Sequence, residues 1–437
     1  MAVGRENGHT KGAEENGDQH PIPSIALTYE STDPERSARR LVQVIRPDWR
    51  SPDSNIELVR FTEGITNTLF KIVNKRPGLS KSDIDKEAIL LRAYGQGTDL
   101  IIDRHREAQN HELLMRHGLA PQLLLRFGNG MLYRFVPGAV TQPEDLRKPE
   151  IYKAVARRLA EWHAVVPCIS ARTGHSRKNS RVDGAVGVAL DSNLGDDEFQ
   201  LALDGVAPGK PPPNIWTVMQ KWIFALPTET EAEIARQAEL QQEFKKLVSE
   251  LSHRPGLGVN GLVFAHCDLL SGNVIVLPKS QLANGDKSSE PTVAFIDYEY
   301  ATPSPAAFDL ANHFAEWGGF DCDYSVLPTR TQRREFISEY ITSYFEKKKP
   351  GKSATVDKAA EIEQLLQEVD HYRGLPGFYW GIWALIQATI SEIDFDYARY
   401  AETRLGEYYA WRAEVTGARE KSGQEMPLRE RRWAQEK

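Results

Sequence analysis

Two short segments in the second half of the chain restrict its fold more than any other feature of the sequence. The first, HCDLLSGNVIVL at residues 266–277, places Asp268 five positions before Asn273. The second, VAFIDYEY at residues 293–300, is an apolar strand with Asp297 at its end. Phosphoryl transfer from a nucleotide requires this arrangement, in which one carboxylate orients the attacking hydroxyl while an amide and a second carboxylate hold magnesium.

Asp268 is the candidate catalytic base. It would orient the hydroxyl and accept its proton late, and general base catalysis typically contributes roughly a hundredfold to ten-thousandfold. An isolated His-x-Asp is usually a turn or a helix cap, but Asn273 at this spacing and the strand before Asp297 outweigh that interpretation. Asn273 and Asp297 are the candidate magnesium ligands, because magnesium takes oxygen ligands and keeps several waters. For His266 we expect a structural hydrogen bond and no part in the chemistry.

The composition fits one large two-lobed domain or two domains and excludes several classes of protein. The 437 residues are 41% hydrophobic, and the formal net charge of −7 argues against a general binder of nucleic acid. Cys168, Cys267 and Cys322 are far apart and odd in number, which favours a reducing compartment over a disulfide framework or a zinc site. No apolar run is long enough to span a membrane, and residues 1–21 have the composition of a disordered tail without a secretory signal, so we expect a cytoplasmic protein.

Residues 22–136 have the pattern of a small, strand-rich lobe. A helix is predicted at residues 33–45, with Asp33 as its capping acceptor and a proline in its first turn. Strands are predicted at residues 55–61, 68–73 and 88–95, followed by a helix at 103–117 that Gly118 ends. An Asn-Gly pair at 129–130, between the apolar runs LLLRFG and MLYRFV, predicts a hairpin.

Residues 137–437 form the second predicted lobe and are mostly helical in pattern. An amphipathic helix is expected at residues 151–165, and helical spacing returns from Trp216. Between them, residues 175–214 are rich in Gly, Pro, Ser and charged side chains, which predicts a long loop or insertion. A small β-rich lobe, a short connector and a large helical lobe together predict an α+β chain with the protein-kinase-like two-lobed fold, whose nucleotide lies between the lobes.

The turn TEGITN at residues 62–67 lies between the first two predicted strands, where such a fold covers the phosphates of the nucleotide. It contains a single glycine, Gly64, and the hydroxyl of Thr66 could contact phosphate oxygens together with the backbone amides. Arg92 lies on the third strand, where protein kinases carry a phosphate-binding lysine, and arginine binds phosphate bidentately. Glu107 on the following helix is its candidate partner. The alternative is an ordinary surface ion pair, worth under about 1 kcal/mol.

Two later segments concern the second substrate. FDLANHFAEW at residues 308–317 supplies two candidate acids, Asp309 and Glu316. Within residues 377–402, Trp380 and Trp383 lie on one face of a helix, and Tyr400 falls on the next helix. An aromatic stripe is usually part of a core. An aromatic wall beside carboxylates, however, is also how a small organic cation is held, through cation–π attraction and charge.

With these segments in this order, the chain resembles the choline/ethanolamine kinases from about residue 55 to residue 411. The matching segments are TEGITN, LLRAYG, HGLAP, RRLAEWH, HCDLLSGN, FIDYEY, FDLANHFAEW and WGIWALIQ. Within that family it looks more like the ethanolamine kinases. The features are the two leucines after Asp268, Tyr298 after Asp297, and the segments ALIQ and EIDFDYARYAE.

The resemblance implies ATP- and Mg²⁺-dependent phosphorylation of ethanolamine to phosphoethanolamine, the entry step of phosphatidylethanolamine synthesis through CDP-ethanolamine. It implies the roles given above for Asp268, Asn273 and Asp297. The implied nucleotide-binding residues are Gly64, Thr66, Asn67, Arg92, Glu107, Arg134 and Phe135. The connector at residues 134–137 would contact adenine through its backbone. The amino-alcohol pocket would be lined by Tyr300, Glu316, Trp380, Trp383 and Tyr400.

The chain departs from the family pattern beside the catalytic segments. Cys267 stands where the family usually has asparagine between the histidine and the catalytic aspartate, and we expect activity to survive this change. The run ATPSPAA at residues 301–307 replaces a YNY-like run, and we expect it on the substrate side. Ala311 replaces a glycine, which is a small change in packing.

Several alternatives to an ethanolamine kinase stay open at this point. The amino alcohol could be choline, or the enzyme could use both. A phosphotransferase for another small cation, such as an aminoglycoside, and a pseudokinase that serves as a binding module are less favoured, because the paired tryptophans and the complete set of Asp268, Asn273 and Asp297 count against them. The family resemblance is compatible with a homodimer.

Overall fold

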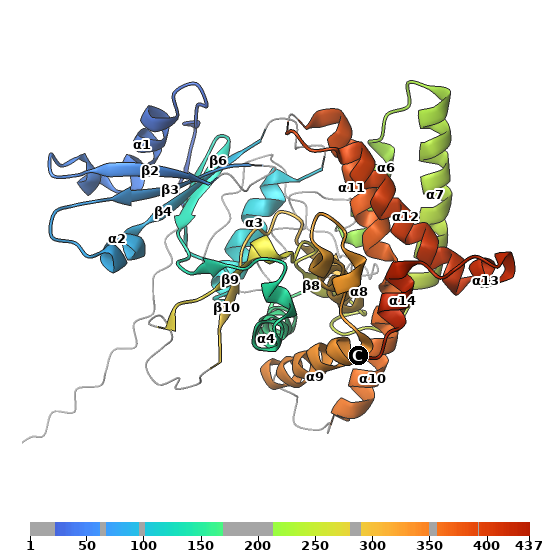
Figure 1. Cartoon of the computed structure of the whole chain (residues 1–437). Coiled ribbons are helices and arrows are strands. Elements are labelled where there is room, and N and C mark those ends of the chain that lie inside the picture. The colour runs from blue at the N-terminus through green and yellow to red at the C-terminus, as the bar shows by residue number, and fades with distance from the viewer. Residues whose placement is uncertain are drawn as a thin grey trace, which may run out of the picture.

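The computed structural model describes residues 22–61, 67–95, 101–168, 213–279, 290–348, 356–391 and 393–437. These residues form a small lobe built on a sheet and a larger, mainly helical lobe (Figure 1). The predicted tail at 1–21, residues 175–212 of the predicted insertion, and Gly64 and Thr66 of the turn at 62–67 lie outside the described residues.

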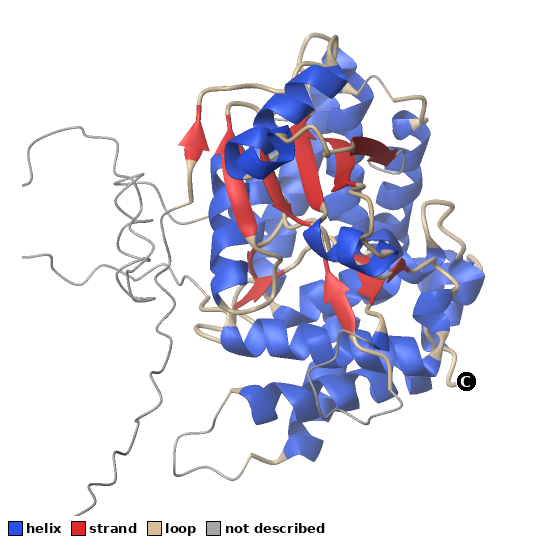
Figure 2. Ribbon diagram, turned by 90° about the vertical axis from the view of Figure 1, so that its left-hand side faces the viewer, coloured by secondary structure: helices blue, strands red, loops and turns tan. Residues whose placement is uncertain are grey.

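The small lobe contains a six-stranded sheet with the strand order β1-β5-β6-β4-β3-β2. Its strands are antiparallel except for the pair β1 and β5, and Figure 2 shows them side by side in the upper half of the view. The strands are β1 (Ser24–Ile25), β2 (Ile56–Phe61), β3 (Asn67–Asn74), β4 (Ile89–Tyr94), β5 (Leu123–Phe127) and β6 (Gly130–Arg134). The helices are α1 (Pro34–Ile45), α2 (Lys81–Glu87) and α3 (Arg104–Arg116).

The predicted order of strands and helices in this lobe is confirmed, with two additions and one correction. The sequence reasoning missed β1, which is only two residues long, and α2, which has no buried residue and therefore no apolar pattern. Asp33 precedes α1 as predicted, but its side chain makes no capping hydrogen bond; instead the Ser37 hydroxyl donates to the Asp33 carbonyl at 2.7 Å.

Gly118 and Gly130 are two of the glycines whose conformation or neighbours a side chain would disturb. Gly118 follows α3 with φ +68°, the left-handed conformation that commonly ends a helix. Gly130 opens β6, and a Cβ atom there would lie 2.1 Å from the carbonyl oxygen of Arg92. The absence of a side chain at Gly130 therefore lets β6 approach β4 closely at the residue predicted to bind phosphate.

The large lobe consists of helices around two short sheets. The three-stranded sheet has the order β10-β9-β7, and β11 pairs with β8. The strands of the large lobe are β7 (Ala139–Val140), β8 (Val263–Ala265), β9 (Val274–Val276), β10 (Val293–Phe295) and β11 (Thr302–Ser304). Its helices are α4 (Pro149–Val165), α6 (Ile215–Phe224), α7 (Glu231–Leu251), α8 (Ala306–Ala315), α9 (Arg330–Lys347), α10 (Lys358–Tyr372), α11 (Leu375–Ile390), α12 (Tyr397–Val415), α13 (Ala418–Ser422) and α14 (Leu428–Ala434). Short 3-10 helices are η1 (Pro47–Arg50), η3 (Asp145–Arg147), η4 (Ser271–Asn273), η6 (Glu316–Gly318) and η7 (Tyr324–Val326).

Each lobe has its own apolar core. In the small lobe, α1 buries Ala38, Leu41 and Val42 against the sheet. The larger cluster joins α4, α6 to α12 and the short strands, and α11 with α12 makes its most extensive helix pair, at the right of Figure 1. This arrangement confirms the predicted two-lobed, protein-kinase-like α+β fold. Among the described helices, none has both the length and the apolar character that a membrane span needs.

Candidate active site

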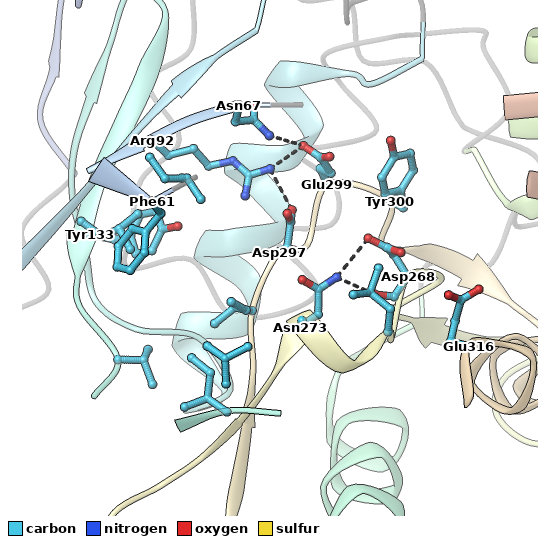
Figure 3. A pocket seen from close by; sticks show the side chains of 18 of the residues that line it. Phe61, Asn67, Arg92, Tyr133, Asp268, Asn273, Asp297, Glu299, Tyr300 and Glu316 are labelled. Atoms are coloured by element: carbon cyan, nitrogen blue, oxygen red, sulfur yellow. Dashed lines mark hydrogen bonds and ion pairs between the residues drawn. The ribbon is translucent and has the colours of Figure 1, made fainter. Parts of the chain in front are cut away.

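A cavity of about 310 Å³ lies between the two lobes (Figure 3). Both lobes contribute to it, so residues far apart in the sequence face one another across it. The residues that line it are Phe61, Asn67, Leu69, Leu90, Arg92, Tyr133, Phe135, Val136, Gly138, Val140, Asp268, Leu270, Gly272, Asn273, Ile275, Ile296, Asp297, Glu299, Tyr300, Glu316, Phe320, Trp380, Trp383 and Tyr400.

Asp268 and Asn273 are held together by hydrogen bonds within one loop. The loop leaves β8, carries Asp268, turns through η4 and enters β9 directly after Asn273. The Asn273 side-chain amide donates to the backbone oxygen of Asp268 at 2.8 Å and to its Oδ2 at 3.0 Å. Because both bonds use the amide nitrogen, the amide oxygen points away from Asp268, as Figure 3 shows. The five-residue spacing therefore both orients the candidate base and leaves an oxygen for a cation.

The pairing of β9 with β10 brings the second carboxylate to the same place. Phe295 pairs with Val274, and the Ile296 amide donates to the Asn273 carbonyl at 3.0 Å. Asp297 follows with φ +65°, a left-handed conformation that is uncommon for a residue with a side chain. Such backbone strain tends to occur where a site fixes a side chain, and here it turns the Asp297 carboxylate into the cavity (Figure 3).

Asp309 does not line the cavity, which contradicts its prediction as a cation-binding acid. Its fully buried carboxylate lies behind the catalytic loop and accepts hydrogen bonds from the backbone amides of His266 at 3.0 Å and Cys267 at 2.7 Å. His163 lies 3.0 Å from the same carboxylate. Since Cys267 has φ +63°, Asp309 stabilises a strained turn immediately before Asp268. His266 contacts the Ile296 carbonyl at 3.1 Å, so its predicted structural role is confirmed.

Arg92 is the central cation of the small-lobe side. Its Nε lies 3.0 Å from Glu107, as predicted, and Nη2 lies 2.8 Å from Asp297. The same Nη2 also contacts Glu299, to which the Asn67 side chain donates at 3.0 Å. The Arg92 side chain is only 5% exposed, so the alternative of a surface ion pair is excluded.

Burial and three neighbouring carboxylates together raise the pKa of Asp268. Burial raises the pKa of the Asp268 carboxyl well above its usual range, and the negative charges of Asp297 and Glu316 raise it further. Glu299 acts in the same direction, while the hydrogen bond from Asn273 opposes the shift. Cations that enter the cavity reverse this effect, because an opposite charge nearby favours the ionised form.

The aromatic residues predicted to hold a small cation lie together at the other end of the cavity. The Trp383 indole donates to the Tyr300 hydroxyl at 2.8 Å, and the rings of Trp380 and Trp383 meet edge to face at 5.4 Å. The Trp380 indole donates to Asn312 at 2.8 Å, whose amide in turn donates to the carbonyl of Cys267 at 3.0 Å. Asn312 therefore connects the aromatic wall, through hydrogen bonds, to the loop that carries Asp268.

Glu316 lies at the same end of the cavity, on the far side of Asp268 from Arg92 (Figure 3). Burial raises the pKa of its carboxyl, and the Arg404 guanidinium, 3.1 Å from its Oε1, opposes that shift. No local pattern distinguishes Arg404 from the many other arginines on helices, so it was not selected from the sequence. Glu299 was also missed as a site residue, although its position two residues after Asp297 placed it within the recognised segment.

The connector at residues 134–137 lies along the cavity, where the sequence places it. Phe135 and Val136 line the cavity, whereas Arg134 does not. The amide of Arg134 donates to the Gln122 carbonyl and that of Phe135 to the Ala88 carbonyl, so neither can donate to a ligand. A backbone donor to adenine at this place would have to come from Val136, the next residue along the cavity wall.

Two of the three departures from the family pattern, Cys267 and the run at residues 301–307, are in contact behind the site. Residues 302–304 form the buried strand β11, paired with β8, and no residue of 301–307 lines the cavity; the expectation of a place on the substrate side is therefore wrong. The Cys267 sulfur lies 3.4 Å from the Ser304 hydroxyl. Cys267, which departs from the family pattern, therefore packs against β11, which belongs to the second departure at residues 301–307.

The donor set at this site suits magnesium. Asp297 and Asn273 offer oxygen atoms side by side, and Mg²⁺ commonly takes one or two protein ligands with phosphates and water completing the shell. Within the described residues, no group of three or more His, Cys, Asp or Glu side chains is placed to hold a metal ion.

The fold and the cavity together define a phosphotransferase of the protein-kinase-like class. A sequence model of the choline/ethanolamine kinases matches residues 58–409, and the chain belongs to that family of kinases. It is 33% identical over 389 residues to a probable ethanolamine kinase from Nematostella vectensis, a match that covers 89% of this chain and 96% of that protein.

Other relatives agree. Ethanolamine kinase 1 of Mus musculus is 31% identical over 411 residues, covering 90% of this chain and 95% of that protein. Among solved structures, an ethanolamine kinase from Plasmodium vivax superimposes with a TM-score of 0.62 at 25% identity, covering 87% of this chain and 89% of that one. The similarity extends through both lobes, as the sequence resemblance predicts.

Proposed function

We propose that this protein transfers the γ-phosphoryl group of ATP to the hydroxyl of ethanolamine, giving phosphoethanolamine, the first step of the CDP-ethanolamine route to phosphatidylethanolamine. One observation supports it above the others: a single cavity has the triad of Asp268, Asn273 and Asp297 beside a carboxylate, Glu316, within an aromatic wall. The ethanolamine kinases among its relatives, similar over nearly their whole length, support the same substrate.

The transfer centre lies in the middle of the cavity. Asp268 orients the ethanolamine hydroxyl and accepts its proton as the bond to phosphorus forms. Asn273 keeps Asp268 in place through one hydrogen bond to its backbone oxygen and one to its carboxylate. Asn273 and Asp297 would hold Mg²⁺, which neutralises charge on the transferring phosphate. Arg92 is the candidate ligand of the other phosphates, and Glu107 fixes its guanidinium.

The ammonium end of ethanolamine fits the far end of the cavity. Glu316 supplies negative charge, and Tyr300, Trp380, Trp383 and Tyr400 supply ring faces and edges. A primary ammonium has three N–H donors and choline's nitrogen has none, so carboxylate and hydroxyl acceptors in this wall favour ethanolamine. The cytoplasmic location and the homodimer stay predictions.

The test is a direct comparison of acceptors. Purified protein with ATP and Mg²⁺ is given ethanolamine or choline, and kcat/KM is measured for each. The proposal expects the higher value for ethanolamine. A much higher value for choline would favour a choline kinase, and transfer to neither, with transfer to another cationic alcohol, would favour the broader phosphotransferase.

A further inference from the structure

The C-terminal helix α14 is joined to the cavity by a buried series of charged side chains. The series begins at Glu316 and passes through α12 to α14, which lies after the segment that the family sequence model matches. The closest approaches are Glu316–Arg404 at 3.1 Å, Arg404–Glu407 at 3.4 Å, Glu407–Arg429 at 3.6 Å, Arg429–Glu430 at 2.9 Å and Glu430–Arg373 at 3.0 Å.

These charges are removed from water, so each depends on its neighbours. The side chains of Arg404, Glu407 and Arg429 are 1%, 2% and 3% exposed. Removing one partner of a buried ion pair is costly because it leaves the other charge uncompensated. Negative and positive side chains alternate along the series. Glu407 and Glu430 therefore each lie between two arginines, and Glu316, at the start of the series, contacts Arg404.

Arg404 is divided between two carboxylates. Its Nη2 serves Glu316 and its Nη1 serves Glu407, while its guanidinium also lies 5.7 Å from the ring of Tyr400, which lines the cavity. The second oxygen of Glu407 is buried and lies 3.6 Å from Arg429 Nε, and the Tyr324 hydroxyl is a further neighbour of this carboxylate. Without Arg429, Glu407 would compete with Glu316 for Arg404.

We infer that Arg429 is a positioning residue for the amino alcohol: by balancing Glu407 it leaves Arg404 to hold Glu316 ionised and in place at the cavity wall. The inference rests on the proposed function, in which Glu316 binds the ammonium group. Arg429 itself is separated from Glu316 by three consecutive ion pairs and does not line the cavity.

The decisive experiment compares single and double variants in the full-length protein. Arg429→Met is expected to raise KM for ethanolamine about tenfold, with kcat and KM for ATP within about twofold of the wild type. A purely structural role would instead lower the active fraction and therefore kcat. In Arg429→Met/Glu407→Gln the competing carboxylate is also gone, so KM for ethanolamine is expected to return to within about threefold of the wild-type value.

Arg431→Met is the matched control, because Arg431 lies on the same helix and is exposed; it should leave all three constants unchanged. An unchanged KM in Arg429→Met, or a double variant as impaired as the single one, would overturn the inference. Should Arg429→Met fail to fold, Glu407→Gln alone decides: KM for ethanolamine should stay near the wild-type value, and a large rise would refute the inference. Wild-type protein unable to phosphorylate ethanolamine would refute the proposed function itself.

Discussion

Two buried arginines, Arg92 and Arg404, differ in how the charges around them are balanced. Arg92 lines one end of the cavity, and Arg404 lies behind Glu316 at the other. Arg92 contacts the carboxylates of Glu107, Asp297 and Glu299, and Arg104 is the second cation beside them. These acids outnumber the guanidinium groups, and Asp268 adds a further carboxylate nearby. Around Arg404, in contrast, acids and arginines alternate until the charges match.

This difference indicates what each end needs in order to function. The Arg92 end has an excess of carboxylate, and a divalent cation is the natural complement of that negative charge. The Arg404 end is completed by the protein's own C-terminal helix, which leaves Glu316 as the one member of that series facing the cavity. At the Arg92 end, positive charge must therefore come from a ligand. At the Arg404 end, the protein's own arginines supply it.

The largest effect is expected from Asp268→Asn. The variant keeps a hydrogen-bond acceptor for Asn273 but removes the base, so kcat should fall by about a thousandfold or more while ATP still binds. The folded state raises the pKa of Asp268, which means that its ionised form costs stability at neutral pH. The melting temperature should therefore rise at neutral pH, and the gain should shrink as the pH falls and Asp268 becomes protonated.

Calorimetric melting and ATP turnover on the same samples test both parts. A variant with near-normal turnover would contradict the catalytic assignment. A variant that melts below the wild type at neutral pH would contradict the claim that the ionised Asp268 carboxylate destabilises the folded protein.

Arg92→Met should affect the nucleotide side alone. We expect kcat/KM for ATP to fall by about a hundredfold, because a buried guanidinium that can bind phosphate bidentately is lost. KM for ethanolamine should change little. If both substrates lose affinity equally, the two ends are not independent and the comparison with Arg404 fails.

Glu316→Gln is the counterpart at the other end. The substitution keeps the size of the side chain and removes its charge, so KM for ethanolamine should rise by about tenfold to fiftyfold while KM for ATP stays constant. Steady-state kinetics with each substrate varied in turn gives both constants. An unchanged KM for ethanolamine would place the ammonium group elsewhere.

The smallest effect is a shift in pH dependence. Because the pKa of Asp268 is raised in the free enzyme, the acidic limb of kcat/KM should lie above the range of an ordinary carboxyl group. The charge of Glu316 contributes to that shift, so Glu316→Gln should move the limb to lower pH. A limb that moves to higher pH, or does not move, would show that the two carboxylates are not coupled.

The sequence predicted that Asp268, Asn273 and Asp297 lie together, because the determinants of their proximity are local. The spacing of Asp268 and Asn273, and a strand ending at Asp297, require only the pairing of two adjacent strands to bring three side chains together. The order of strands and helices in the small lobe was equally accessible, since alternation and turn residues mark it. The short polar helix α2 has no such pattern, and it was missed.

The errors concern residues whose role depends on packing between distant elements. Asp309 was expected in the substrate site, but α8 directs its carboxylate at the back of the catalytic loop. Residues 301–307 were expected beside the substrate, but β11 pairs with β8 and buries them. Arg404 and Arg429 gain their roles from neighbours in other helices, which no local spacing indicates.

The most direct test of the central claim is to follow the phosphorus atom itself. Wild-type protein and Asp268→Asn are incubated with ATP, Mg²⁺ and ethanolamine, and the products are identified by phosphorus NMR. The account predicts that the wild type forms phosphoethanolamine and ADP in equal amounts, that removal of Mg²⁺ stops the reaction, and that the variant forms almost none. ATP hydrolysis without phosphoethanolamine, or equal product formation by the variant, would contradict it.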